Sequence, residues 1–338
     1  MACLARRFAF VVLLALLGGC ALLNNADTNP AAPRSHVQWA ALAGEIRAFE
    51  RRIGFDETNN FRRFSDEKSA FTFCGHASRL YLPYSYEDPA IEWLDSVTEQ
   101  ECRKFGRSED VVFVVAEALG KVETPVTPSI LAAPLERLVY VVIHENCHEQ
   151  FDLPYGIEEA LCNLIAYKAM AAFGEERFRS MPAQSSAIQR YAREGSERSH
   201  LALTFYEQLA ALYARHDRRE MSSQTLLKQR QIIFRKAERE LSRPKGSMSN
   251  VWMANTMTYS RHYPLVERVF DALGRDLART ILFFRYVDSV KPSEEEVTAR
   301  HGLNAQSGLD FIRAYEAAVA ETIEHTLANG NRMKPNGV

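Results

Sequence analysis

The most constraining feature of the chain is a pair of histidines at the end of an apolar run. Residues 135–143 are apolar enough to bury a helix, and His144 and His148 follow them directly. Residues four apart lie on one face of a helix, so both rings can reach one ion at about 2.0–2.1 Å. The pattern therefore predicts a buried helix that carries two metal ligands.

The residue between these histidines suggests what the metal does. Glu145 cannot easily reach the same coordination position, so we expect it to lean over the open side of the ion. There it could take a proton from a metal-bound water, whose pKa zinc lowers to about 7. Two histidines with this glutamate in a His-Glu-x-x-His pattern are typical of zinc peptidases, and the predicted cofactor is Zn²⁺.

A catalytic zinc needs a third protein ligand, and the next predicted helix offers one. Pro154 and Gly156 break the first helix and allow residues 156–166 to fold back as a second buried helix. Glu159 is then expected to face the histidines, and Asn163, one turn later, is expected to orient an imidazole. The adjacent Glu158 is expected to be solvated or to face the substrate.

Together these two segments resemble the gluzincin metallopeptidases. In that group a His-Glu-x-x-His helix is followed by a helix whose glutamate is the third ligand. The thermolysin-like pattern Asn-Glu-x-x-x-Asp resembles residues 158–163, with Asn163 in place of the aspartate. The resemblance implies a zincin-like fold with Glu145 as general base.

The chain also resembles a bacterial "putative aminopeptidase" family of predicted lipoprotein gluzincins. The resemblance covers most of the mature chain. It rests on residues 46–49, 129–131, 135–138, 212–215 and 233–234, and on Asn250, Tyr259 and Pro264. It implies that Tyr259 donates to the oxyanion of the scissile carbonyl, with Tyr263 and His262 as alternatives. The connector between His148 and Glu159 is shorter than in that family, and its Cys-Phe-Pro-type stretch is missing between residues 73 and 111.

The N-terminus resembles a lipoprotein signal. Arg6 and Arg7 precede an apolar stretch of residues 8–17, which is too short to span a membrane, and residues 17–20 form a lipobox-like Leu-Gly-Gly-Cys. We expect cleavage after residue 19 and lipidation of Cys20. Ala21 favours the outer membrane if the host is Gram-negative. The predicted location is therefore the cell envelope, anchored by lipid at the periplasmic face of the outer membrane.

Four further cysteines remain in the mature chain. Because export permits disulfides, Cys74, Cys102, Cys147 and Cys162 can pair in three ways. A bridge between Cys147 and Cys162 would staple the two predicted ligand helices together, which leaves Cys74 with Cys102. Two buried thiols at 147 and 162 are the alternative.

Composition and patterning predict an α+β fold that is mainly helical. The 338 residues are 46% hydrophobic and 25% charged with a net charge of −2, which gives no field for nucleic acid. Residues 111–115 form the strongest strand, either interior or at the cleft edge, where it could bind a peptide by main-chain hydrogen bonds. Helices are predicted over residues 39–52, over two stretches within 196–242 that break near 217–223, over 250–273 with an interruption at Pro264, over 276–287 and from 294 onward.

The predicted organisation has four parts. Residues 1–19 are the signal peptide and 20–36 the lipidated cysteine and tether. Residues 37–175 form a zincin-like catalytic subdomain with a small sheet at the cleft edge, and 176–330 a helical lobe that closes the cleft. The predicted partners are a peptide substrate and, through the lipid, a membrane.

The predicted function is that of a zinc-dependent aminopeptidase. Glu117, Glu123 and Glu158 are acidic candidates for holding a free α-amino group, although no residue is singled out. The alternatives are a zinc endopeptidase and a non-catalytic peptide-binding envelope lipoprotein that retains the zincin fold. An intact Glu145 favours an enzyme, because a protein that only binds has no need of this residue.

Overall fold

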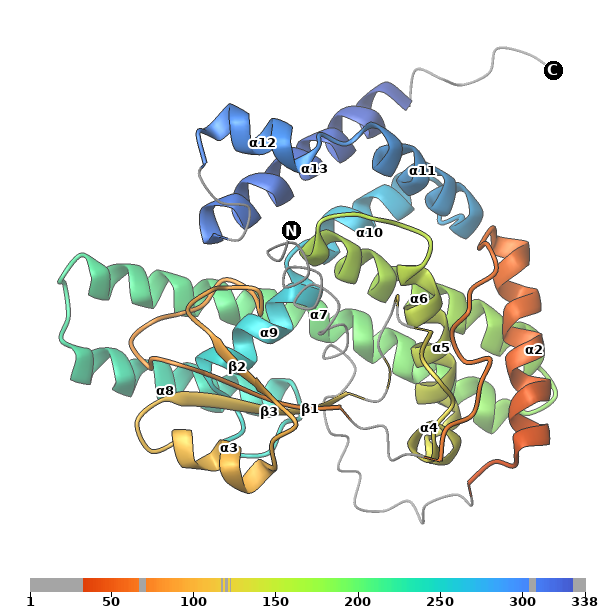
Figure 1. Ribbon diagram of the computed structural model, residues 1–338, viewed down its shortest axis with the longest axis horizontal. Coiled ribbons are helices and arrows are strands. Elements are labelled where there is room, and N and C mark those ends of the chain that lie inside the picture. Colours follow the sequence, from red (N-terminus) through yellow and green to blue (C-terminus); the bar gives the residue numbers. More distant parts are fainter. Residues whose placement is uncertain are drawn as a thin grey trace, which may run out of the picture.

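The computed structural model describes residues 33–66, 71–116, 118, 121, 123–303 and 308–330. Its helices are α2 (His36–Ile53), α3 (Glu99–Phe105), α4 (Pro128–Ala132), α5 (Leu135–His148), α6 (Tyr155–Arg177), α7 (Pro182–Asp217), α8 (Ser223–Glu240), α9 (Asn250–Ser260), α10 (Tyr263–Ala272), α11 (Leu277–Val290), α12 (Glu294–His301) and α13 (Leu309–Gly330). Its strands are β1 (Phe71–Ala77), β2 (Glu92–Asp95) and β3 (Asp110–Ala116). The fold is mainly helical, as predicted (Figure 1).

A three-stranded antiparallel sheet forms one side of the molecule. The strand order is β2-β1-β3, so the strand predicted over residues 111–115 is an edge strand and not an interior one. Helices α3 and α9 both contact β1 and β3, and Figure 1 shows the sheet between them. Gly75 in β1 is required because the Trp93 ring of β2 occupies the space where a side chain would lie.

The other side of the molecule is a helical core built on α5, α6 and α7. Every residue of α5 from Leu138 to His148 is buried, and so is nearly every residue in the first half of α6. Helix α6 packs against α5, α7 and α9. Because residues 138–148 of α5 and the first half of α6 are enclosed on all sides, polar groups there are removed from water and need partners within the protein.

Local signals set several of the element boundaries. Ser35 caps α2 in a capping box with Gln38, in keeping with the preference for serine at helix N-caps. Gly54 ends the helix in the left-handed conformation, which glycine adopts readily. Ser293 and Glu296 form a second capping box that starts α12, where the acidic run predicted a helix. The predicted breaks near residues 217–223 and at Pro264 are confirmed, although the first long helix begins earlier, at Pro182.

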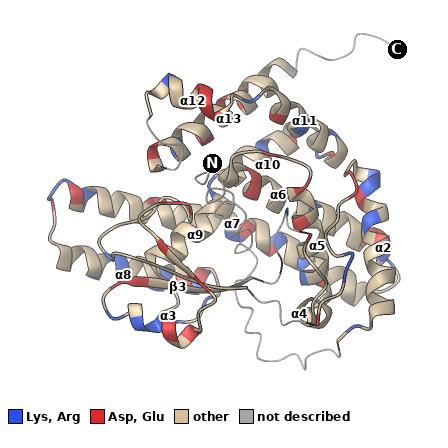
Figure 2. Cartoon of the chain, in the orientation of Figure 1, with Lys and Arg blue, Asp and Glu red and all other residues tan. Residues whose placement is uncertain are grey.

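The lipoprotein signal, Cys20 and most of the predicted tether lie outside the described residues. Within the described part of the chain, no helix has both the length and the apolar character that crossing a membrane requires. Figure 2 shows acidic and basic residues interspersed over the molecule, in keeping with the near-neutral net charge. The division of the mature chain at residue 175 stays a prediction.

Candidate metal centre

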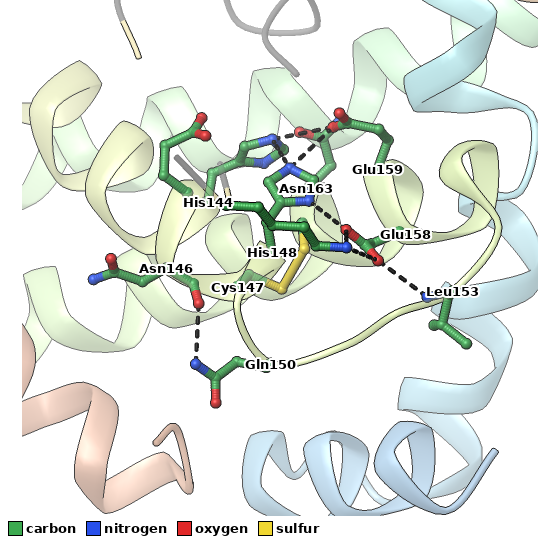
Figure 3. Close-up of a disulfide and its surroundings, with 12 residues drawn as sticks. His144, Asn146, Cys147, His148, Gln150, Leu153, Glu158, Glu159 and Asn163 are labelled. Atoms are coloured by element: carbon green, nitrogen blue, oxygen red, sulfur yellow. Dashed lines mark hydrogen bonds and ion pairs between the residues drawn. A yellow bond between two sulfur atoms is a disulfide. The ribbon is translucent and has the colours of Figure 1, made fainter. Parts of the chain in front are cut away.

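Helices α5 and α6 bring the three predicted metal ligands together. Pro154 precedes α6, and the short connector after His148 lets the helix fold back against α5. His144 Nε2 lies 3.2 Å from His148 Nε2 and 3.2 Å from Glu159 Oε2. His148 Nε2 lies 3.5 Å from the same carboxylate oxygen. Figure 3 shows the three side chains converging on one point.

These separations fit a tetrahedral metal. Three donors that are each about 2.0–2.1 Å from an ion, at tetrahedral angles, lie about 3.3–3.4 Å from one another. All three side chains are fully buried, with ligating atoms within 4.8 Å of each other. The Glu159 carboxylate is fully buried, and among the described residues its contacts include His144 Nε2, His148 Nε2 and the side chain of Tyr155. A buried carboxylate beside two imidazoles is the donor set that a divalent cation completes.

The electrostatics of the cluster also favour a cation. Burial opposes protonation of His148, but the negative charges of Glu159 and Glu158 outweigh it and raise the histidine pKa well above its ordinary value. Burial lowers the pKa of His144, against the effect of Glu159. The carboxylates of Glu158 and Glu159 therefore favour a positive charge at His148 inside the protein.

Glu158 was wrongly expected to be solvated or to face the substrate. The side chain is buried, and its Oε1 accepts a hydrogen bond of 2.8 Å from Nδ1 of His148. Its Oε2 accepts the backbone N–H of Leu153 at 3.0 Å, and Lys121 Nζ lies 2.9 Å from Oε1. Glu158 therefore fixes the tautomer of His148 so that Nε2 faces the metal position.

Asn163 reaches the second imidazole through a tyrosine. Tyr140, one turn before His144 on α5, donates its hydroxyl to Asn163 Oδ1 at 2.5 Å, and the hydroxyl oxygen of Tyr140 lies 3.4 Å from His144 Nδ1. The side chain of His144 also forms a hydrogen bond with the backbone of Cys162. Tyr140 was not among the residues predicted from the sequence. Its position four residues before His144, on the same helical face, was the available signal.

Glu145 has the surroundings of a proton-transfer group. The side chain is fully buried, and neither carboxylate oxygen has a hydrogen-bond partner among the described residues. Burial raises the pKa of Glu145 well above its ordinary value. A carboxyl group with a raised pKa holds a proton more readily, as a group that takes and returns one must.

Of the three candidates for the oxyanion donor, Tyr259 lies against the metal ligands. Its buried ring on α9 stands 6.5 Å, centroid to centroid, from the ring of His144. Tyr263 instead donates its hydroxyl to Ser196 Oγ at 2.8 Å. His262 pairs with Glu316 at 2.9 Å, at the start of α10.

Both predicted disulfides form. Cys147 and Cys162 join α5 to α6 with a Cα–Cα distance of 5.5 Å, and the buried-thiol alternative is not what the structure contains. Cys74 and Cys102 join β1 to α3, also at 5.5 Å. The first bridge lies beside a ligand on each helix, one residue before His148 and three after Glu159.

A second set of polar residues supports α5 from the side of α2 and was also missed. Asn146 Nδ2 donates to both oxygens of Glu50 at 3.0 Å, and Thr58 Oγ1 donates to Asn146 Oδ1 at 2.8 Å. Asn60 Nδ2 donates to the backbone carbonyl of Glu145 at 3.1 Å. These bonds fix the helix that carries the ligands. No local sequence pattern indicates that residues this far apart in the chain contact one another.

A pocket of about 460 Å³ opens beside the centre. Its wall includes His148 and consists of Asn59, Lys121, Glu123, His148, Glu149, Phe151 and Asp152. Of the three predicted ligands, His148 borders this pocket, whereas His144 and Glu159 do not line it.

The comparisons with known proteins identify the family. The family model described as "Putative aminopeptidase" matches residues 98–299. The chain belongs to this family. The match includes β3, α5, α6 and α9, and with them His144, Glu145, His148, Glu159 and Tyr259. The comparison with curated proteins found no match, and neither did the comparison with solved structures. The family description points to a peptidase.

Proposed function

We propose that the protein is a zinc-dependent peptidase of gluzincin type. The observation that carries this proposal is the buried triangle of His144, His148 and Glu159, with sides of 3.2, 3.2 and 3.5 Å. Two histidines and one carboxylate leave the fourth tetrahedral position open, as catalytic zinc sites do. A glutamate ligand on the helix that follows is the arrangement that the gluzincin resemblance implies.

The chain's own residues supply the rest of the mechanism. Zn²⁺ in this site would polarise a peptide carbonyl and acidify a water molecule. Glu145 takes the proton of the attacking water at its carboxylate and passes it to the leaving amine. Tyr259 donates its hydroxyl to the developing oxyanion. The enclosed surroundings strengthen each of these interactions, because little water competes with them.

We propose removal of N-terminal residues as the activity, in line with the family description. An aminopeptidase needs a negatively charged group that binds the α-amino group of its substrate. Glu123 is exposed and paired with Arg63, Glu158 is bound to His148, and Glu117 lies outside the described residues. Burial raises the pKa of Glu87 to about 8, and this side chain lies close enough to Glu159 for that charge to contribute to the rise. Its carboxyl group is therefore largely protonated at neutral pH and would have to lose this proton to hold an ammonium group.

We further propose that the protein acts in the cell envelope as a lipid-anchored enzyme. This rests on the lipobox-like residues 17–20 and on the two disulfides, which are typical of oxidising compartments. A peptide-binding lipoprotein without turnover would have the same location. It would not need the buried, unpaired carboxylate of Glu145.

One experiment separates these functions. The mature chain is purified, its metal content is measured, and cleavage is followed on peptide libraries with free or acetylated N-termini, with Glu145→Gln as the matched variant. We expect one zinc per chain and cleavage of free peptides that the variant loses. Absence of zinc at neutral pH would refute the proposal. Zinc with no Glu145-dependent cleavage would indicate a binding protein, and equal cleavage of acetylated peptides an endopeptidase.

A further inference from the structure

The loop after the edge strand β3 reaches the metal centre through one lysine. Lys121 Nζ lies 2.9 Å from Oε1 and 3.0 Å from Oε2 of Glu158. The same Oε1 accepts the bond from His148 Nδ1 at 2.8 Å. A continuous chain of charged and polar contacts therefore runs from a loop at the protein surface to a metal ligand.

Charge compensation is the first argument that this contact matters. The Glu158 side chain is 3% exposed and lies directly behind His148. A carboxylate so far from water is costly unless a cation faces it. Among the described residues, Lys121 is the one Lys or Arg within 4.0 Å of Glu158. Removing this ammonium group leaves His148 Nδ1 and the backbone N–H of Leu153 as the remaining partners of the buried carboxylate.

The backbone of the loop gives a second, independent argument. Lys121 has φ of 61° and Glu123 of 51°, a region that residues other than glycine seldom adopt. Such conformations persist where surrounding contacts impose them, and they cluster at functional sites. Thr124 N donates to Asn60 Oδ1 at 2.9 Å, and Asn60 in turn donates to the carbonyl of Glu145. Lys121 is thus joined to His148 through Glu158, and Thr124 is joined to the backbone of α5 through Asn60.

The pocket beside His148 offers Glu158 another position once the lysine is removed. Lys121 and His148 line the same pocket of about 460 Å³. Without the ammonium group, Glu158 would lower its free energy by turning toward this space and its water. That movement would release Nδ1 of His148 and remove the bond that orients the ring.

We propose that Lys121 is a positioning residue of the metal centre. It neutralises Glu158, and so keeps the carboxylate turned inward and His148 Nε2 aimed at the metal. This inference rests on the proposed zinc function, but its test measures metal binding and not turnover.

The test is a double-mutant cycle on zinc affinity in the full mature chain. The variants are Lys121→Met, Glu158→Gln and the two together, and affinity is measured by competition with a chelator. Lys121→Met should weaken zinc binding by about 10- to 100-fold, as loss of a residue that supports a ligand typically does. In the Glu158→Gln background the same substitution should cost less than about threefold, because no charge remains to be neutralised.

Two further variants keep the result interpretable. Lys121→Arg preserves the charge and should restore most of the affinity. Lys236→Met removes an exposed lysine of α8, paired with Glu240 at 3.8 Å, and should leave affinity unchanged. The absorption spectrum of bound Co²⁺ should change in Lys121→Met and recover in Lys121→Arg. Wild-type affinity in Lys121→Met, or an equal loss in both backgrounds, would overturn the proposal. Failure of the wild-type chain to bind zinc would instead refute the proposed function.

Discussion

The bridge between Cys147 and Cys162 should stabilise both the fold and the metal centre. It joins two helices that each carry ligands, and the separation of 15 residues corresponds to a loop-closure term of about 3 kcal/mol at 25 °C. The bridge between Cys74 and Cys102 spans 28 residues, for which the same relation gives about 3.6 kcal/mol. The two bridges are therefore nearly equal in this term and differ mainly in their distance from the ligands.

This near-equality makes the second bridge a matched control. We expect Cys147→Ala/Cys162→Ala and Cys74→Ala/Cys102→Ala to lower the free energy of unfolding in denaturant by similar amounts. Only the first pair should weaken zinc binding, by on the order of tenfold, because only it sets the spacing of α5 and α6. Chelator competition on the two double variants measures the difference. Equal zinc affinities in both, with similar losses of stability, would refute the reasoning.

The remaining predictions concern three other parts of the molecule. Tyr259→Phe should lower kcat by about 10²- to 10³-fold with zinc content unchanged, and an unaltered kcat would exclude it as the oxyanion donor. Burial, opposed by Asn146, raises the pKa of Glu50 to about 7, so the protonated form is favoured by folding. The contribution of protonated Glu50 to the free energy of unfolding is therefore complete below pH 4.5 and is lost as the pH rises through 7. Between pH 4.5 and 8 the free energy of unfolding should fall by up to about 3 kcal/mol more in wild type than in Glu50→Gln. Parallel pH curves for the two proteins would contradict this. Finally, a chelator should lower the melting temperature, with zinc at 1,000 times its Kd contributing about 4 kcal/mol, and His144→Ala should abolish the difference.

The ligand set could be predicted from the sequence because its geometry is local. The positions of His144 and His148 follow from one helical period, and a short connector with Pro154 constrains where the next helix can lie. The disulfide between 147 and 162 depends on the same pair of helices and was among the predicted pairings. The small sheet was only partly predicted. Strand β3 is rich in valine, whereas β1 contains Gly75 and His76, whose places are set by Trp93 and Glu109 across space.

The role of Glu158 could not be predicted, for a reason that lies in α6 itself. Sequence periodicity indicates which side of a helix is buried only if another side is exposed. The first half of α6 is enclosed all round, so periodicity does not indicate that Glu158 is buried beside the predicted ligand Glu159. The rotation of α6 about its axis directs Glu159 toward the metal position and Glu158 toward His148 Nδ1. Lys121, 37 residues earlier, lies against Glu158 and supplies the compensating charge in our proposal. The two adjacent glutamates therefore serve one centre from different sides, and the contact that makes this possible comes from the loop after the edge strand.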